Sequence, residues 1–282
     1  MIRRLAVVGV GLLGGSVAKA ARAQGLAREI VGIGRDRARL EPALVEGVLD
    51  RATTDLAAGV GEADFVVLAA TVAAIESLLP RVWPAVSPDA VVTDVGSTKR
   101  GIVAAAERLG ATRPLAFVGS HPMAGSERSG YAVARADLFR GATVVVTPTD
   151  ATPPVALKRV TEFWEALGAR VTALDPETHD RAVAAISHLP HLVAMALVDG
   201  AARFEPEALG LAARGFRDTT RIAASDPAVW QEIFMANRDA LAASVEAFQR
   251  ALAELGRLVE RGDPEALRAA IQRVKTTREA LR

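Results

Sequence analysis

One histidine stands where its side chain could serve as a general base. His121 is one of four histidines and lies in residues 119–130, which read GSHPMAGSERSG. It follows the apolar run of residues 115–118, so we expect it on a glycine-bracketed loop at a crevice of an α/β sheet. Histidine accepts and releases a proton near neutral pH, and Pro122 fixes the backbone beside it. A turn with a solvated or capping histidine is the alternative.

A second chemical motif lies near the N-terminus, where glycines follow a short apolar strand. Residues 5–8 lead into the turn GVGLLGGS at residues 9–16, and a helix-like stretch follows. Gly9 permits a tight turn, Gly11 lets the backbone approach a pyrophosphate, and Gly14 lets the helix pack against the strand. The turn therefore predicts a dinucleotide site at a helix N-terminus, with a plain structural turn as the alternative. The cofactor residues expected here are Gly9, Gly11, Leu12, Leu13 and Gly14.

The end of the second strand bears on the choice between NAD and NADP. Residues 29–33 form this strand, and Gly34, Arg35 and Asp36 follow it. A carboxylate there would bind the ribose hydroxyls of NAD, whereas a small residue followed by arginine leaves room for a 2′-phosphate and supplies its counter-charge. The pattern leans slightly to NADP, because Asp36 comes one or two residues late for the NAD role. The alternative is that Arg35 is merely a solvated residue at a helix start. Ala70, which follows the strand at residues 64–69, is also expected in the cofactor site.

Polar residues after another strand fall at the same edge of the sheet. Residues 90–95 form the strand and run into the segment DVGSTK at residues 94–99. The carboxyl ends of parallel strands meet at one edge, so Ser97 and Lys99 should lie on the same rim as His121 and the glycine turn. Ser97 could orient His121 and also border the cofactor. Alternatively, Ser97 or Thr98 caps the next helix, which would not exclude the first role.

Two histidines precede an apolar helix in the C-terminal part. Ser187, His188 and His191 lie ahead of residues 192–198, a helix that we expect to be buried. At a helix start near the crevice, these side chains could reach substrate oxygens. Positions i and i+3 share a helix face, so a metal pair is conceivable, but the sequence places no carboxylate or third histidine to complete it. We predict no metal.

Two arginines in the segment GFRDTTRIA offer a clamp for a carboxylate. Arg217 and Arg221 lie four residues apart and could share a helix face. Guanidinium groups bind carboxylates through two parallel hydrogen bonds. The alternative at this spacing is that both arginines are solvent-exposed surface residues with no binding role.

The elements that carry these residues alternate between strand and helix. Apolar strands at residues 64–69, 90–95, 115–118, 142–147 and 170–174 are separated by helices at residues 72–82, 99–109 and 155–167. Such alternation predicts a doubly wound, mostly parallel sheet with helices on both faces, an α/β fold of the Rossmann-like kind. Strand signals cease at residue 175. We therefore predict a dinucleotide-binding domain at 1–174 and an all-helical domain at 175–282, with residues 148–154 as a competing linker.

The C-terminal part of the chain contains two amphipathic helices. Apolar residues recur at spacings of three and four from Leu241 to Val259, and again from Leu267 to Val274, with Gly262, Asp263 and Pro264 between them. Such faces need a partner surface, either within the chain or across a two-fold axis. We favour a homodimer through the helical domain, because so many apolar helix faces follow a self-contained sheet domain.

The composition of the chain argues against several other classes of function. The 282 residues carry 34 basic and 33 acidic side chains, and this balance argues against a nucleic-acid partner. The absence of cysteine excludes disulfides and cysteine nucleophiles and fits a cytoplasmic protein. The first apolar run meets Gly9 too soon for an export signal. We take residues 65–75 as the longest uncharged apolar stretch, short of the roughly 20 residues that span a membrane, and therefore expect no membrane association.

Taken together, these residues resemble the prephenate and arogenate dehydrogenases of tyrosine biosynthesis. The resemblance covers nearly the whole chain, and its matching stretches are residues 9–16, 94–99, 120–130, 187–191 and 215–224, followed by Trp230 and Asn237. It implies a Rossmann-like domain, a helical dimerisation domain, and an active site in the cleft between them. It further implies NAD(P)-dependent oxidative decarboxylation of prephenate to 4-hydroxyphenylpyruvate, or of arogenate to tyrosine.

The resemblance also implies roles for individual residues. His121 would be the catalytic base and Ser97 its support, Glu127 would lie at the site entrance, His191 would contact substrate, and Arg221 would bind a substrate carboxylate. Gly34-Arg35 departs from the aspartate that many NAD-using members carry. The chain would also lack the fused mutase or regulatory domains of some relatives.

Two other functions compete with this interpretation. One is another Rossmann dehydrogenase with a helical second domain, such as a β-hydroxyacid dehydrogenase or an imine reductase. The β-hydroxyacid enzymes would carry a lysine on a glycine-rich helix after the sheet, and we find no such segment. The other is a non-catalytic nucleotide sensor, against which the joint presence of His121, Ser97 and Arg221 argues.

Overall fold

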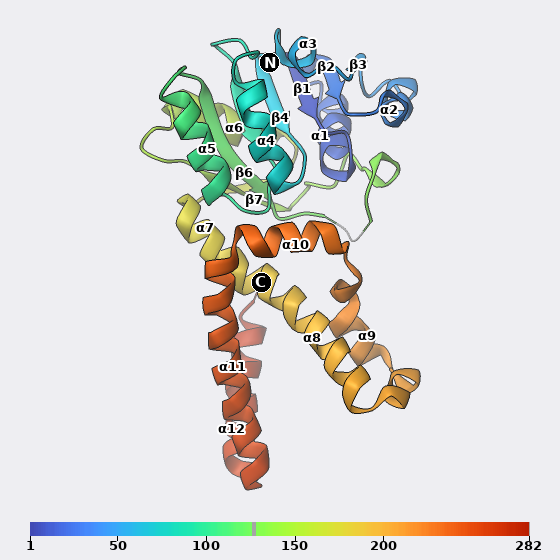
Figure 1. The fold of residues 1–282 in the computed structure, drawn as a ribbon, viewed down its shortest axis with the longest axis vertical. Coiled ribbons are helices and arrows are strands. Elements are labelled where there is room, and N and C mark those ends of the chain that lie inside the picture. The colour runs from blue at the N-terminus through green and yellow to red at the C-terminus, as the bar shows by residue number, and fades with distance from the viewer. Residues whose placement is uncertain (126–127, 282) are drawn as a thin grey trace. The chain divides into compact units, whose positions relative to one another are not determined.

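The computed structural model describes residues 1–125 and 128–281 (Figure 1). Its internal contacts divide the chain into two compact units, Met1–Asn237 and Arg238–Arg282, and each unit is described by itself. This division falls later in the chain than the boundary at residues 174 and 175, which stays a prediction.

An eight-stranded sheet forms the centre of the first unit. Its order is β3-β2-β1-β4-β5-β6-β7-β8, and every neighbouring pair is parallel except β6 and β7. The strands are β1 (Ile2–Val8), β2 (Ala27–Ile33), β3 (Arg51–Thr53), β4 (Phe65–Leu68), β5 (Val91–Asp94), β6 (Ala116–Pro122), β7 (Thr143–Thr147) and β8 (Arg170–Ala173). The chain leaves β1 towards β2 on one side and returns to β4 on the other, which creates a crevice at the carboxyl ends of β1 and β4. The predicted doubly wound class is confirmed.

Helices cover both faces of the sheet because side chains of successive strand residues alternate between faces. Leu5 and Val7 of β1 belong to one buried cluster with residues of the helices α1 (Leu12–Ala23), α2 (Glu41–Val45) and α6 (Pro154–Ala166). Ala6 and Val8 belong to the other cluster, with α3 (Leu56–Val60), α4 (Val72–Val82) and α5 (Arg100–Gly110). The glycine turn and the ends of β4, β5 and β6 therefore share one edge of a well-packed sheet.

A long helical run follows the sheet. The run consists of α7 (Pro176–Val183), one π-helical turn η3 (Ala184–His188) and α8 (Leu189–Phe204). His188 and His191 therefore lie inside a continuous run, and the prediction that they open a helix is wrong. The prediction that residues 192–198 are buried is also wrong, because among them only Ala194 is buried and Leu197 is 41% exposed. The sequence of a helix shows that one of its faces is apolar. It does not show whether other parts of the same chain cover that face.

This run is also a longer apolar stretch than the sequence suggested. Within the described residues, Pro176–Phe204 is one helix whose length and mean hydropathy of 1.5 would let it cross a membrane, a longer stretch than residues 65–75. Only 22% of its apolar window is buried in this chain. The same run carries His179 and Asp180, both buried in the first unit. The absence of a membrane partner stays a prediction.

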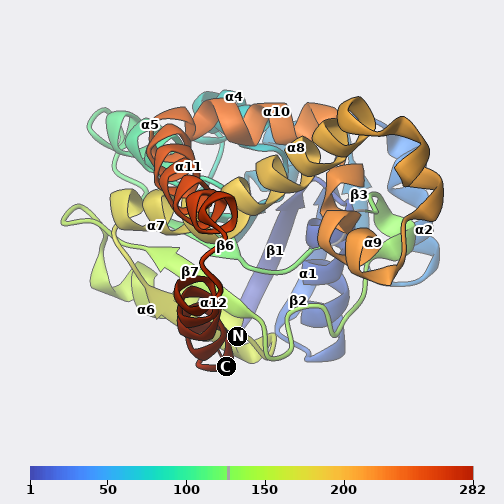
Figure 2. The ribbon, with the colours of Figure 1, turned by 90° about the horizontal axis from the view of Figure 1, so that it is seen from below.

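The remaining elements of the first unit are short. They are η1 (Arg37–Arg39), η2 (Tyr131–Val133), η4 (Pro206–Leu211), α9 (Arg214–Thr220), η5 (Arg221–Ala224) and α10 (Pro227–Ala236), and α10 packs against α4 (Figure 2). The second unit is a pair of helices, α11 (Arg238–Arg261) and α12 (Pro264–Glu279). Gly262 adopts φ +63° between them, and the Asp263 side chain accepts the Ala266 N–H at 3.0 Å, so the predicted break forms as expected. Side chains such as Leu252 and Ile271 are more than half exposed.

Candidate active site

The glycine turn after β1 has the shape of a cradle for a dinucleotide. Gly9 has φ +96°, and a Cβ atom there would lie 2.2 Å from the Ala69 carbonyl oxygen. A Cβ atom on Gly14 would lie 1.9 Å from the Gly9 oxygen, so both positions require glycine. A Cβ atom on Gly11 would meet nothing within 4 Å, and Gly11 caps α1 without a side-chain hydrogen bond. The first turn of α1, with Leu12 and Leu13, thus presents open backbone N–H groups that fit a pyrophosphate.

The residues beside this cradle come from β2 and β4. Arg35 is exposed just after β2. The Asp36 carboxylate accepts the Ala38 N–H at 2.9 Å and lies 3.7 Å from Arg39, so it caps its own helical turn. Ala70 follows β4 next to Gly9, since a Cβ atom on Gly9 would lie 3.7 Å from the Ala70 nitrogen. The fold therefore gathers all the predicted cofactor residues of β1, β2 and β4 at the strand ends.

His121 belongs to a strand and not to a loop, which corrects the sequence-based expectation. It lies in β6 and pairs with Val145 of the antiparallel strand β7. The pairing continues to Met123, whose N–H donates to the Thr143 oxygen at 2.8 Å. His121 stays partly exposed. Its backbone is thus fixed by strand pairing, which holds the imidazole more firmly than a glycine-bracketed loop would.

The imidazole of His121 contacts a second histidine that the sequence analysis missed. His121 Nδ1 lies 2.9 Å from His179 Nε2, and His179 Nδ1 lies 2.7 Å from Asp180 Oδ1. The two rings meet edge to face at 70°, with centroids 5.1 Å apart. His179 and Asp180 are fully buried on α7. The three side chains form one continuous hydrogen-bonded chain from strand to helix.

The carboxylate of Asp180 is anchored by the start of α5. It accepts the backbone N–H groups of Lys99 at 2.7 Å and of Arg100 at 3.0 Å, and Arg100 Nε lies 3.5 Å away. Burial raises the pKa of Asp180, but the hydrogen bonds from His179, Arg100 and Lys99 outweigh burial, so the pKa is lowered. Asp180 is therefore an anion at neutral pH.

Lys99 lies beneath the rim, not on it as the sequence suggested. Its ammonium group is fully buried, forms an ion pair with Asp94 and donates to the Ser120 carbonyl oxygen at 2.9 Å. Asp94 also accepts the Ser120 N–H at 3.0 Å. Ser97 is partly exposed after β5. Within the described residues, no hydrogen bond joins Ser97 to His121, whose Nδ1 is already bonded to His179, and the supporting role of Ser97 stays a prediction.

Three neighbours and burial hold His121 in its neutral form. Burial lowers the pKa of His121 well below its ordinary value of 6.5, and the charges of His179, Lys99 and His188 lower it further. A neutral imidazole is the form that can accept a proton. His121 is therefore available as a base at neutral pH.

The other histidines form a second cluster with residues of α10. His188 is buried, and its Nδ1 lies 3.2 Å from Asn237 Nδ2, which also donates to the Asp180 carbonyl oxygen at 2.7 Å. Burial lowers the pKa of His188 to about 4, with Asp180 acting in the opposite sense. His191 stacks on Trp230 with centroids 3.5 Å apart, and its Nδ1 lies 2.9 Å from the Ser187 carbonyl oxygen. Among the described residues, no group of three side chains could hold a metal ion.

The two arginines of the expected clamp lie on adjoining elements. Arg217 belongs to α9 and donates from Nε to the Ala212 carbonyl oxygen at 3.0 Å, whereas Arg221 is the C-cap residue of α9 and opens η5. Their joint role as a clamp stays a prediction. Burial lowers the pKa of His191, and the charge of Arg221 lowers it further, so Arg221 lies near His191. Glu127 lies outside the described residues.

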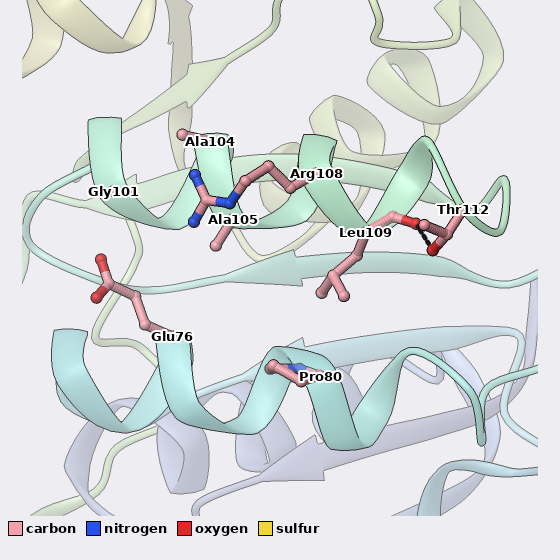
Figure 3. Close-up of a pocket in the computed structure, with 8 residues that line it drawn as sticks. All are labelled: Glu76, Pro80, Gly101, Ala104, Ala105, Arg108, Leu109 and Thr112. Atoms are coloured by element: carbon pink, nitrogen blue, oxygen red, sulfur yellow. Dashed lines mark hydrogen bonds between the residues drawn. The ribbon is translucent and has the colours of Figure 1, made fainter.

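A surface groove elsewhere in the first unit contains none of these residues. It has a volume of about 430 Å³ and lies between α4 and α5 (Figure 3). Its charged lining residues are Glu76 and Arg108, and the rest of the lining is mostly small or apolar. The groove therefore lies apart from the histidine cluster.

Comparison with known families shows which family the chain belongs to. A family model described as "Prephenate dehydrogenase, nucleotide-binding domain" matches residues 17–173, and one described as "Prephenate dehydrogenase, dimerization domain" matches residues 175–273. The chain belongs to the prephenate dehydrogenase family. The resemblance drawn from the sequence motifs is confirmed.

Individual members of the prephenate dehydrogenase family match almost the whole chain. A prephenate dehydrogenase of Bacillus subtilis is 34% identical over 98% of this chain and 75% of its own length. A cyclohexadienyl dehydrogenase of Zymomonas mobilis is 32% identical over 100% of this chain and 97% of its own length. These shares place nearly the whole chain within the family.

Solved structures of the family superpose closely on this one. The prephenate dehydrogenase of Aquifex aeolicus, in complex with hydroxyphenyl propionate and NAD+, gives a TM-score of 0.93 at 35% identity and covers 100% of this chain and 99% of its own. An arogenate dehydrogenase of Synechocystis gives 0.86 at 32% identity, covering 98% of this chain and 99% of its own. A 3-hydroxyisobutyrate dehydrogenase of Mycobacterium tuberculosis, at 15% identity and a TM-score of 0.54, shares the fold alone.

Proposed function

We propose that this chain oxidatively decarboxylates prephenate to 4-hydroxyphenylpyruvate, or arogenate to tyrosine, with NAD(P) in tyrosine biosynthesis. Membership of the prephenate dehydrogenase family over nearly the whole chain carries this proposal. When bound at the glycine turn, NAD(P) supplies the acceptor for the hydride that leaves the substrate carbinol. His121 accepts the hydroxyl proton of the same carbinol. Loss of carbon dioxide then aromatises the ring and makes the reaction effectively irreversible.

The residues around His121 would hold the substrate dianion in place. Arg221 would bind a carboxylate, and His191, stacked on Trp230, would contact a substrate oxygen. Ser187 and His188 are proposed as further substrate contacts, Ser97 as the support of His121 beside the cofactor, and Glu127 as a residue at the site entrance. Positioning of the reacting atoms is the main contribution of the protein.

The proposed oligomer is a homodimer through the helical domain of residues 175–282. The dimerisation-domain description of the matching family model supports it, as do apolar side chains left exposed on α8, α11 and α12. We propose a cytoplasmic enzyme with a small-molecule substrate and neither nucleic acid nor membrane as partner.

We predict that NADP is used in preference to NAD, because Arg35 is exposed beyond β2 and Asp36 caps its own turn. Turnover is to be measured with prephenate or arogenate and with NADP or NAD, following reduced nicotinamide. Replacing Arg35 by Ser should lower kcat/KM for NADP about tenfold, the value of one charge-assisted contact, and leave NAD unchanged. Arg39→Ser is the matched control. A strong NAD preference in the unmodified enzyme would contradict the role of Arg35, and no turnover in all four combinations would contradict the proposed function.

The pH dependence of kcat/KM should reflect the lowered pKa of His121. The neutral form is the active one, and the pKa lies well below 6.5. Activity should therefore persist below pH 6.5 and fall only as the pH drops through this lowered pKa. A pH profile of kcat/KM in the free enzyme tests this. An acid limb at or above pH 6.5 would show that burial and the three neighbouring groups do not keep His121 neutral.

A further inference from the structure

With a neutral His179, the hydrogen-bonded chain behind His121 has only one consistent direction of donation, whereas an imidazolium would donate from both ring nitrogens. Asp180 is an anion and can only accept hydrogen bonds, so His179 Nδ1 must carry a proton and donate it to Oδ1. A neutral His179 then has a bare Nε2, which can only accept. The partner at 2.9 Å is His121 Nδ1, which must therefore be the donor. In neutral His121 the lone pair is left on Nε2.

We propose that His179 and Asp180 are positioning residues that fix His121 as the tautomer protonated on Nδ1, so that Nε2 is the basic atom. This inference rests on the proposed function of His121 as the base. Neither residue needs to touch the substrate, because both act through the imidazole. His121 Nε2 is the atom that would take the hydroxyl proton: the substrate O–H bond breaks, an Nε2–H bond forms, and the electron pair remains on the substrate oxygen.

The anchoring of Asp180 gives the row of hydrogen bonds from Asp180 to His121 its direction of donation. Its carboxylate is held by two backbone N–H groups at the start of α5, and its carbonyl oxygen accepts from Asn237. The start of α5 thus fixes the carboxylate against His179, and Asn237 holds the backbone of the same residue. Its negative charge also favours the imidazolium that forms when Nε2 takes the proton.

The other charged groups around His121 cannot set this tautomer. Lys99 and His188 influence His121 through their charges. The hydrogen bonds of Lys99 Nζ go to Asp94 and Ser120, and that of His188 Nδ1 goes to Asn237. Among the described contacts, only His179 is hydrogen bonded to the His121 ring. The choice between Nδ1–H and Nε2–H therefore falls to His179.

The tautomer can be measured directly, without turnover. The full chain is labelled with ¹⁵N-histidine, and long-range ¹H–¹⁵N correlation spectra at neutral pH distinguish Nδ1–H from Nε2–H; the His121→Asn variant assigns the signals among only four histidines. We expect His121 to be protonated on Nδ1, with and without NADP. A His121 protonated on Nε2 would overturn the inference. The spectrum needs no substrate, so it reports the His121 tautomer even if the chain proves to lack the proposed activity.

Two replacements of His179 separate its two contacts. Gln places an oxygen near the position of Nε2 and can still accept from His121, whereas Asn reaches only the position of Nδ1 and keeps the contact with Asp180. We expect Asn to lower kcat about 100-fold with little change in KM, and Gln to retain at least about tenfold more activity than Asn. Equal losses in the two folded variants would overturn the inference, as would full activity of the Asn variant.

A matched control comes from the same helix. Glu177 lies on α7 and pairs through Oε2 with Arg100 Nη1 at 3.4 Å, but is largely exposed and its side chain is not hydrogen bonded to His179. Glu177→Gln should leave kcat and the His121 tautomer unchanged.

Discussion

Replacing His121 by Asn is expected to lower kcat by about 10³-fold, within the range that a general base contributes. The Asn amide can occupy the position of Nδ1 and keep its contact with His179, so the change removes chiefly the basic Nε2. The cofactor cradle lies at Gly9 to Gly14 on β1 and α1. Binding of the reduced cofactor, NADPH, should therefore be unchanged, which titration of its nicotinamide fluorescence measures alongside kcat.

A second replacement separates proton uptake from hydrogen bonding. Gln at position 121 can bring an amide oxygen near the position of Nε2, where it accepts a hydrogen bond but is not basic. Its kcat should be as low as that of the Asn variant. If either variant kept turnover comparable to the unmodified enzyme, His121 would not be the base.

The doubly wound sheet could be predicted because its strands and helices have strong local patterns. Helix α4 forms at residues 72–82 as expected, and the other strands and helices predicted for the sheet domain lie within a few residues of their predicted bounds, for instance β5 and α6. The short elements β3, α2 and α3 were not predicted. Each has three to five residues, too few for a periodic pattern, and tertiary packing decides their structure.

The candidate site was only half predictable, because its key contact is remote in sequence. His121 was singled out by its glycine-rich surroundings, but its partner lies 58 residues away. The available signal was the adjacency of His179 and Asp180 one turn after Asp175, which caps α7 by accepting the Thr178 N–H at 2.9 Å. Nothing in that pattern says which strand the helix faces. The strand setting of His121 was missed for the same reason, since it depends on pairing with β7.

The buried ion pair under the site leads to the largest expected change in stability. Lys99 and Asp94 are both fully buried and paired. Burial lowers the pKa of Lys99, and the charges of Asp94 and Asp180 oppose this effect. Replacing Lys99 by Met keeps most of the side-chain volume but leaves the Asp94 charge buried without its partner. We expect a loss of about 3–5 kcal/mol in the free energy of unfolding.

Urea unfolding of single and double variants tests whether this loss belongs to the pair. In the double variant Lys99→Met with Asp94→Asn no charge is left unpaired, and the single Asn oxygen can still accept from one of the two N–H groups, of Ser120 or of Gly96, that bind the two oxygens of Asp94 at 3.0 and 2.8 Å. The double variant should therefore be more stable than Lys99→Met alone. Lys158→Met is the control, because Lys158 pairs with Glu162 at the exposed surface and its replacement should change stability by less than about 0.5 kcal/mol.

Equal effects of Lys99→Met and Lys158→Met would mean that the buried charge of Asp94 is compensated by its backbone donors alone. A double variant as unstable as the sum of its single changes would mean that the two charges do not interact, whereas recovery in the double variant would identify the ion pair as the element that fastens β5 and β6 beneath His121.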